Sequence, residues 1–193
     1  MKYFAMVLAL IAGAAYLSAP ALADETNSAA AHVIVNVVPN VAVTANTPQV
    51  VVNSIQSSEF NVAVQFQVQA NTQVLDLSVQ ASNLFKHDDI ASPYVIPLKS
   101  GTETVSATIT SGSPLGGANN LLSFTGSAAS PISVIGHSYP AMTTATKRYG
   151  SGQGEFWNQA VDVTVAYDQS SQTLPTGEYS GAIQLTALVV PTP

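Results

Sequence analysis

Cysteine is absent from this chain of 193 residues, and charged residues make up only 8% of it. Without cysteine there is no disulfide to constrain the unfolded chain, no thiolate zinc cluster and no thiol nucleophile. Lysine and arginine total five against eleven acidic residues, too few to neutralise many phosphates, so we expect no nucleic-acid partner. The 47% hydrophobic content combined with so little charge argues against an intrinsically disordered chain.

Residues 1–23 have the pattern of a secretory signal peptide. Lys2 precedes an apolar run from Tyr3 to Leu17, and Ser18–Ala23 offers small residues for cleavage after Ala23. The run is shorter than the ~20 residues that span a bilayer, and we expect no transmembrane anchor after cleavage. We therefore predict a bacterial protein that is secreted, periplasmic or attached to the cell surface.

Most of the remaining chain alternates apolar and polar residues, which is typical of half-buried strands. The clearest examples are Glu59–Gln69, Val74–Gln80, Val161–Tyr167 and Tyr179–Val189. Because only an Asn71-Thr72 turn separates the first two, we predict that they form a β-hairpin. No segment after the signal peptide shows helical periodicity.

Weaker patterns predict further short strands between turn residues. They lie at Val33–Val38, Val41–Thr44, Gln49–Ile55, Tyr94–Leu98, Thr102–Thr110, Leu121–Phe124 and Ile132–Ile135. Many short strands without helices predict an all-β fold, an antiparallel immunoglobulin-like or jelly-roll β-sandwich with an N-terminal strand extension. We expect three regions: the signal peptide, an extension at 24–45 that is a candidate donor strand, and a sandwich domain at 46–193.

Two glycine- and serine-rich stretches, Ser111–Asn120 and His137–Gly154, are predicted to be loops. The second is longer than ordinary connections, which favours a functional or mobile segment. Within it, Gly150-Ser151-Gly152 lacks the frame of a nucleophile elbow and the lysine of a phosphate-binding loop, so we interpret it as a flexible loop.

Residues suited to catalysis or metal binding do not cluster in the sequence. His32, His87 and His137 fall in different predicted elements. Lys86–Asp89 could offer calcium ligands through its two aspartates, but it lacks the spaced acidic pattern of a calcium loop, and a solvated turn is favoured. The carboxylates that could pair for glycoside hydrolysis are distant from one another: Asp76, Glu155, Asp162 and Glu178. We predict no enzymatic activity, cofactor or metal.

Aromatic residues in and beside the long loop offer an alternative function. Tyr139, Tyr149 and Trp157 would form a stacking platform if they were exposed, and the protein would then be a monomeric secreted binding module for a glycan or a protein. A core position is the simpler interpretation of Trp157, because it begins a predicted strand.

The segment Leu174–Ala187 carries the most specific pattern in the chain. Its Pro175, Gly177, Tyr179 and Gly181 precede alternating apolar residues. This pattern resembles the C-terminal hairpin of bacterial pilin-like surface proteins, including spore coat protein U and chaperone-usher-type subunits. The resemblance implies an immunoglobulin-like fold in which the tyrosine packs over the turn as in a tyrosine corner. Many of those pilins contain a disulfide, which this chain lacks.

The same resemblance gives a role to the start of the exported chain. In such families an apolar N-terminal extension adds a strand to the next subunit, and here Val33, Val35 and Val37 would fill its pockets. The alternative is that this segment is the first strand of its own sheet. The chain also contains 23 asparagine and glutamine residues, and its clearest strands lack the lysines that keep an exposed edge from pairing with another chain. This composition suits a protein whose strand edges are occupied by a partner. We therefore predict a structural subunit of an extracellular filament, pilus or surface layer that assembles with itself or with other surface subunits.

Overall fold

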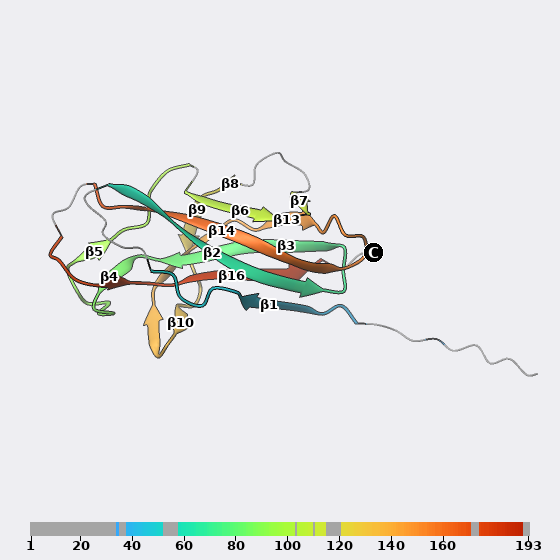
Figure 1. Cartoon of the computed structure of the whole chain (residues 1–193), viewed down its shortest axis with the longest axis horizontal. Helices are drawn as coiled ribbons and strands as arrows, with labels where there is room; N and C mark the ends of the chain where they lie inside the picture. Colours follow the sequence, from blue (N-terminus) through green and yellow to red (C-terminus); the bar gives the residue numbers. More distant parts are fainter. Residues whose placement is uncertain are drawn as a thin grey trace, which may run out of the picture. The chain divides into compact units, whose positions relative to one another are not determined.

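The computed structural model describes residues 34, 38–51, 58–102, 104–109, 111–114, 121–170 and 174–190. The chain divides into two units, Met1–Val37 and Val38–Pro193, and the strands described here belong to the second. All regular structure in the described residues is β-strand with antiparallel pairing (Figure 1). The predicted all-β class is confirmed.

The first large sheet, sheet A, is built around its two longest strands. Its order is β1 (Val41–Ala45), β2 (Glu59–Ala70), β14 (Trp157–Asp168), β6 (Val105–Ile109) and β8 (Leu121–Leu122). Strands β2 and β14 pair along twelve residues each. The predicted alternation in β14 is confirmed, because Val161, Val163, Val165 and Tyr167 are fully buried while Asp162 is exposed.

The second large sheet, sheet B, has β3 at its centre. It contains β7 (Ser113–Pro114), β13 (Lys147–Gly150), β3 (Val74–Ser82), β12 (Ala141–Thr144), β9 (Phe124–Ser127) and β16 (Ile183–Val189). Strands β12 and β13 pair with successive parts of one edge of β3. Strand β16 pairs with the opposite edge over seven residues, from Ile183 opposite Ala81 to Val189 opposite Leu75.

Two small sheets complete the fold. One is the hairpin of β10 (Ile132–Val134) and β11 (His137–Tyr139), and the other joins β15 (Tyr179–Ser180), β4 (Leu84–Lys86) and β5 (Val95–Ile96). Tyr179 is the first residue of β15, and its hydroxyl donates a hydrogen bond of 2.9 Å to the Pro175 carbonyl, four residues upstream. The tyrosine side chain therefore closes the turn that leads into β15.

Sheets A and B contribute side chains to one hydrophobic core. Its members include Phe66 and Val68 of β2, Leu75, Leu77 and Val79 of β3, Val105 and Ile109 of β6, Tyr149 of β13, Trp157, Val161, Val163 and Val165 of β14, and Leu185 of β16. A smaller cluster under the β10–β11 hairpin contains Phe85, Ile132, Tyr139, Ala141 and Ala182.

The predicted hairpin between Glu59–Gln69 and Val74–Gln80 is wrong. Both segments are strands, but β2 pairs with β1 and β14, whereas β3 pairs with β12, β13 and β16. The short turn between them carries the chain from sheet A to sheet B. Alternation shows that each strand has one buried face, but it does not show whether two such faces share a sheet or oppose each other across a core.

The predicted long loop at His137–Gly154 is also wrong, because the segment forms β11, β12 and β13. Strands of three or four residues carry too few alternating positions to be distinguished from loops. The other weak strands are present as β1, β5, β6, β8 with β9, and β10, some of them shorter than predicted. Gln49–Val51 are not in a strand, and residues 52–55, like Val33 and Val35–Val37, lie outside the described residues.

Candidate functional site

One edge of sheet A is only partly covered. Strand β1 pairs with Phe66–Ala70 of β2, and an additional hydrogen bond joins the Asn46 amide to the Gln65 carbonyl at 2.9 Å. Beyond that bond, no strand among the described residues pairs with this side of β2. On this side, the first half of β2 up to Val64 therefore has no partner strand among the residues that the structure describes.

The core is correspondingly thin behind this half of β2. Phe60, Val62 and Val64 point inward but are only half-buried, although the residues opposite them in β14 are fully buried. The Phe60 ring stacks on Tyr167 with the ring centroids 5.5 Å apart. These three side chains belong to the core yet keep part of their surface exposed.

The neighbouring edge of sheet B is also open. Strand β16 uses one side for β3, and its other side has no partner strand in the part of the chain that the structure describes. Strands β1 and β2 both contact β16, so the edge strands of the two sheets are neighbours (Figure 1). Of the inward side chains of β16, Leu185 is buried, whereas Ile183, Ala187 and Val189 are half-buried.

The outer edge of β16 and the first half of β2, to which the described residues supply no partner strand, are together called the edge groove below. Strand β16 contains no charged residue and no proline, the two usual devices that prevent an edge from pairing with another chain. Glu59, at the start of β2, is held in an ion pair with Lys99 at 2.7 Å. Backbone groups without a described partner strand and half-buried apolar side chains are the two features on which strand addition by an extended segment depends.

The predicted donor residues Val33, Val35 and Val37 lie outside the described residues. The other end of the predicted extension, Val41–Ala45, is β1 and pairs within its own unit. Within the predicted extension, only the part before β1 is therefore left as a candidate donor segment.

The predicted stacking platform is not formed. Tyr139, Tyr149 and Trp157 have only 3%, 1% and 1% of their surface exposed, because each packs into one of the two hydrophobic clusters. The Trp157 indole Nε1 donates to the Gln73 carbonyl at 3.2 Å. Burial raises the pKa of the Tyr149 hydroxyl above its ordinary value. Core packing thus decides the position of these rings, as the simpler interpretation of Trp157 anticipated.

The Lys86–Asp89 turn connects three parts of the fold instead of being merely solvated. His87 and Asp88 both have positive φ, 56° and 59°, in a tight turn closed by a hydrogen bond from the Asp89 amide to the Lys86 carbonyl. The Asp88 carboxylate accepts hydrogen bonds from the hydroxyls of Ser180 and, at 2.6 Å, Tyr139. The hydrogen bond from Ser180, which has the larger effect, and the one from Tyr139 both lower the pKa of Asp88.

His137 adds a further contact to the same carboxylate, with its Nε2 3.7 Å from Asp88 Oδ2. Sequence reasoning missed this cluster because its members are separated by about 50 to 90 positions. Ser180 and His137 both contact Asp88, so the aspartate lies between them. The serine and the histidine are therefore not hydrogen-bonded to each other, as nucleophilic catalysis by a serine would require. The cluster fastens the β10–β11 hairpin and β15 to the turn.

The other candidate carboxylates are held on outer faces. Asp76 pairs with Arg148 at 2.9 Å, and Asp162 accepts a hydrogen bond of 2.8 Å from Gln65. Glu155 and Glu178 are exposed. Among the described residues, no three histidine, aspartate or glutamate side chains are grouped closely enough to hold a metal ion.

The predicted flexible loop at Gly150-Ser151-Gly152 is a hydrogen-bonded turn. Ser151 is fully buried, its amide donates to the Gln73 carbonyl at 2.9 Å, and its hydroxyl donates to the Gly154 carbonyl at 2.9 Å. Gly152 has φ +66° and lies so close to Ser111 that an added Cβ would sit 1.7 Å from the Ser111 carbonyl oxygen. Gly152 therefore allows a close contact between two backbone segments.

No protein-family model matches this chain, and the comparison with curated proteins finds no match. Function is therefore inferred from the strand edges and side-chain contacts of the described residues. In the described part of the chain, no helix has the length and apolar character needed to cross a membrane. Of the features found, only the edge groove combines accessible apolar side chains with unpaired backbone groups.

Proposed function

We propose that this protein is a structural subunit of an extracellular bacterial filament, pilus or surface layer. Each subunit would insert a strand from its N-terminal segment into the edge groove of another copy or of a related surface subunit. In this proposal the protein has no enzymatic role and acts outside the cytoplasm after its signal peptide is removed. The single observation that carries the proposal is the pair of adjacent open edges on β16 and β2.

Strand order supports an immunoglobulin-like sandwich. Immunoglobulin sheets have the orders A-B-E-D and C-F-G. The order β1-β2-β14-β6 in sheet A corresponds to A-B-E-D, and β3-β16 in sheet B corresponds to C-F. The Tyr179 corner lies between β14 and β16, where the E–F corner of such a fold carries its tyrosine. Strand G, which would pair with the outer edge of β16, has no counterpart in the described residues.

The unoccupied G position is where a strand from another subunit would be accommodated. Its backbone would pair with β16, and its alternate side chains would cover the half-buried Phe60, Val62 and Ala187. In the N-terminal segment, Val33, Val35 and Val37 share one face of an extended strand, and Ile34, Asn36 and Val38 share the other. The valine face supplies compact apolar side chains at the spacing that the groove requires.

A peptide binding experiment tests the proposal without relying on an accessory chaperone. The acceptor is the full chain carrying Val33→Asp, Val35→Asp and Val37→Asp, so that its own donor segment cannot compete. The probe is a fluorescent peptide of residues 24–40 with the natural sequence, followed by anisotropy. We expect saturable binding that survives in a denaturing gel until the sample is boiled, because main-chain pairing in a buried groove dissociates slowly.

Two control peptides identify the face that binds. A peptide with aspartate at 33, 35 and 37 should lose binding, whereas one with aspartate at Ile34 and Val38 should retain most of it. Equal affinity of the two control peptides would contradict the assignment of the valine face. Absence of binding by the natural peptide, together with absence of boiling-sensitive oligomers of the unmodified protein, would overturn the proposed function and favour a monomeric binding module.

A further inference from the structure

Asn71, the first residue after β2, holds the stretch of chain just before β1. Its side-chain Oδ1 accepts a hydrogen bond of 2.6 Å from the Asn40 amide, and its Nδ2 donates one of 3.0 Å to the Val38 carbonyl. Its own amide donates to the Asn40 carbonyl at 3.3 Å. Residues 38–40 are all exposed, so these hydrogen bonds, and not burial, keep that stretch in place.

The same bonds keep Val38–Asn40 in line with β1. Val41 of β1 lies opposite Ala70 of β2, so Asn40 and Asn71 form the next pair of the same antiparallel ladder. Strand β2 ends at this point and its chain crosses to sheet B. The described chain therefore enters β1 from beyond the end of β2.

The outer edge of β16 runs in the opposite sense from the same end of the two sheets. Val189, the last residue of β16, is paired with Leu75 near the start of β3. Strand β16 therefore ends close to the turn between β2 and β3, where β1 begins, and its outer edge extends back from there. A segment that precedes β1 could lie along this edge in its own copy only if the chain reversed direction close to Val38.

Such a reversal conflicts with the hydrogen bonds of Asn71. Pro39 has a fixed φ, and the residue before a proline, here Val38, is restricted to extended backbone. A reversal placed earlier in the chain would use Val37 in the turn and would remove it from the valine face. The contacts of Asn71 therefore oppose closure of the edge groove by the segment of the same copy.

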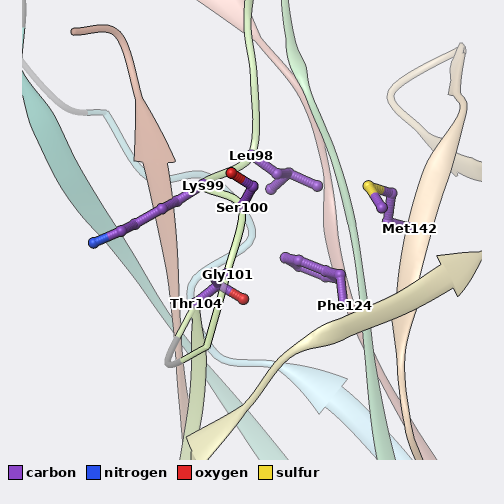
Figure 2. Close-up of a pocket in the computed structure, with 7 residues that line it drawn as sticks. All are labelled: Leu98, Lys99, Ser100, Gly101, Thr104, Phe124 and Met142. Carbon is purple, nitrogen blue, oxygen red and sulfur yellow. The ribbon is translucent and has the colours of Figure 1, made fainter.

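The pocket drawn in Figure 2 offers the valine face no alternative. It has a volume of about 150 Å³, and its apolar lining is Leu98, Phe124 and Met142. Phe124 and Met142 belong to β9 and β12, and β12 pairs with the edge of β3 opposite to β16. A cavity of this size holds one group about as large as benzene, whereas an inserted strand must place several side chains.

We propose that Asn71 is a positioning residue that directs the N-terminal segment to another copy of the chain and away from its own edge groove. This inference rests on the proposed function, because it concerns how the same groove is filled. Donor segment and groove are different surfaces, so insertion into another copy is a heterologous contact that repeats along a filament. Closure within one copy would end at the monomer.

Replacing Asn71 with alanine should allow a copy to close its own groove. Asn71 is exposed, so the substitution leaves the core intact. The unmodified chain and Asn71→Ala, both expressed from the complete coding sequence, are refolded at a concentration too low for copies to associate and are titrated with the fluorescent peptide of residues 24–40. We expect Asn71→Ala to bind the peptide about fivefold more weakly, because its own segment competes once two side-chain hydrogen bonds are lost.

Three further variants separate chain direction from a structural effect. In the acceptor with aspartate at 33, 35 and 37, adding Asn71→Ala should leave the affinity unchanged, because no competing segment remains. Asn71→Asp keeps the acceptor for the Asn40 amide and loses the donor to Val38, so its affinity should be intermediate. Asn46→Ala is the matched control at the other end of β1, where the Asn46 Nδ2 donates to Gln65 Oε1 at 3.1 Å, and it should bind like the unmodified chain.

Equal affinities of the unmodified chain and Asn71→Ala would overturn the positioning role. A loss of affinity that persists in the aspartate acceptor would also overturn it, because Asn71 would then shape the groove itself. If only the aspartate acceptor bound the peptide, the unmodified chain would be closing its own groove despite Asn71, and this inference would fail while strand insertion was supported. If neither protein bound the peptide, the proposed function would fail and this inference with it.

Discussion

Gln159 is the side chain whose replacement most directly tests the described packing near the start of β14. It is buried, its Oε1 accepts a hydrogen bond of 3.1 Å from the Ser111 amide, and its Nε2 donates one of 2.8 Å to the Ser151 carbonyl. The side chain therefore joins the segment before β7 to the turn after β13. Gln159→Met keeps a similar length and volume but removes both polar atoms.

The expected loss follows from the two hydrogen bonds and from the groups they leave behind. Each bond contributes about 0.5–1.5 kcal/mol net, and an unpaired buried carbonyl costs about 1–3 kcal/mol. The Ser151 carbonyl belongs to a fully buried residue, whereas Ser111 is exposed and its amide can bind water. We therefore expect Gln159→Met to lower the free energy of unfolding by about 3 kcal/mol.

Urea denaturation followed by circular dichroism measures this loss. With a slope of about 2 kcal/mol per molar urea, the midpoint should fall by roughly 1.5 M. Gln153→Met is the matched control, because Gln153 also hydrogen-bonds the backbone, accepting from the Asn158 amide at 3.0 Å, but is half-exposed. We expect the control to lose less than about 1 kcal/mol, since water can replace it. Equal midpoints for the two variants would refute the buried bridging role of Gln159.

Three further predictions concern backbone conformation and charge. Ile135→Gly should raise the free energy of unfolding by about 1 kcal/mol, because glycine adopts a φ of 50° without strain, and a lower thermal midpoint would contradict this. Gly152→Ala should lower the free energy of unfolding by at least about 3 kcal/mol, because its Cβ would overlap the Ser111 carbonyl. Gly154→Ala, at a positive φ but with open space around it, should lower it by only about 1 kcal/mol, and comparable urea midpoints for the two variants would be inconsistent with the close contact. The pKa of Asp88 is lowered by its two hydroxyl donors, so its stabilising contribution is present above the ordinary value of 3.8 and disappears as the pH falls through the lower folded value. Asp88→Asn should therefore flatten the acid side of the stability profile, and an unchanged slope there would count against the cluster.

Period-two alternation predicted the strands that carry many alternating positions. The segment Glu59–Gln69 lies within β2, and Val161–Tyr167 lies within β14. In both strands the apolar positions face the core, since burial of one face is what creates the pattern. The packing of Tyr179 over its turn was implied by the resemblance of that segment to pilin-like proteins, and its hydrogen bond reaches only four residues back, to Pro175.

The features that the sequence did not predict depend on contacts between distant residues. Asp88 is hydrogen-bonded to side chains 51 and 92 positions away, and neither spacing has a local signature. Tyr139 and Tyr149 were placed in a loop because β11 and β13 are too short to show alternation. Once those segments are strands, their aromatic rings have a sheet face on which to pack and are removed from the surface.

The error about the β2–β3 hairpin bears on the proposed function. If these strands formed a hairpin, β2 would have β3 on one side and β14 on the other, and no edge of β2 would be open. Because the chain instead crosses to sheet B after β2, that side of β2 is left to β1, which pairs only with Phe66–Ala70. The crossing also leaves β3 free to pair with β16 along seven residues, which places the outer edge of β16 beside β1. The same change of sheet that defeats a local prediction therefore leaves the two strand edges, unpaired among the described residues, on which the strand-addition proposal rests.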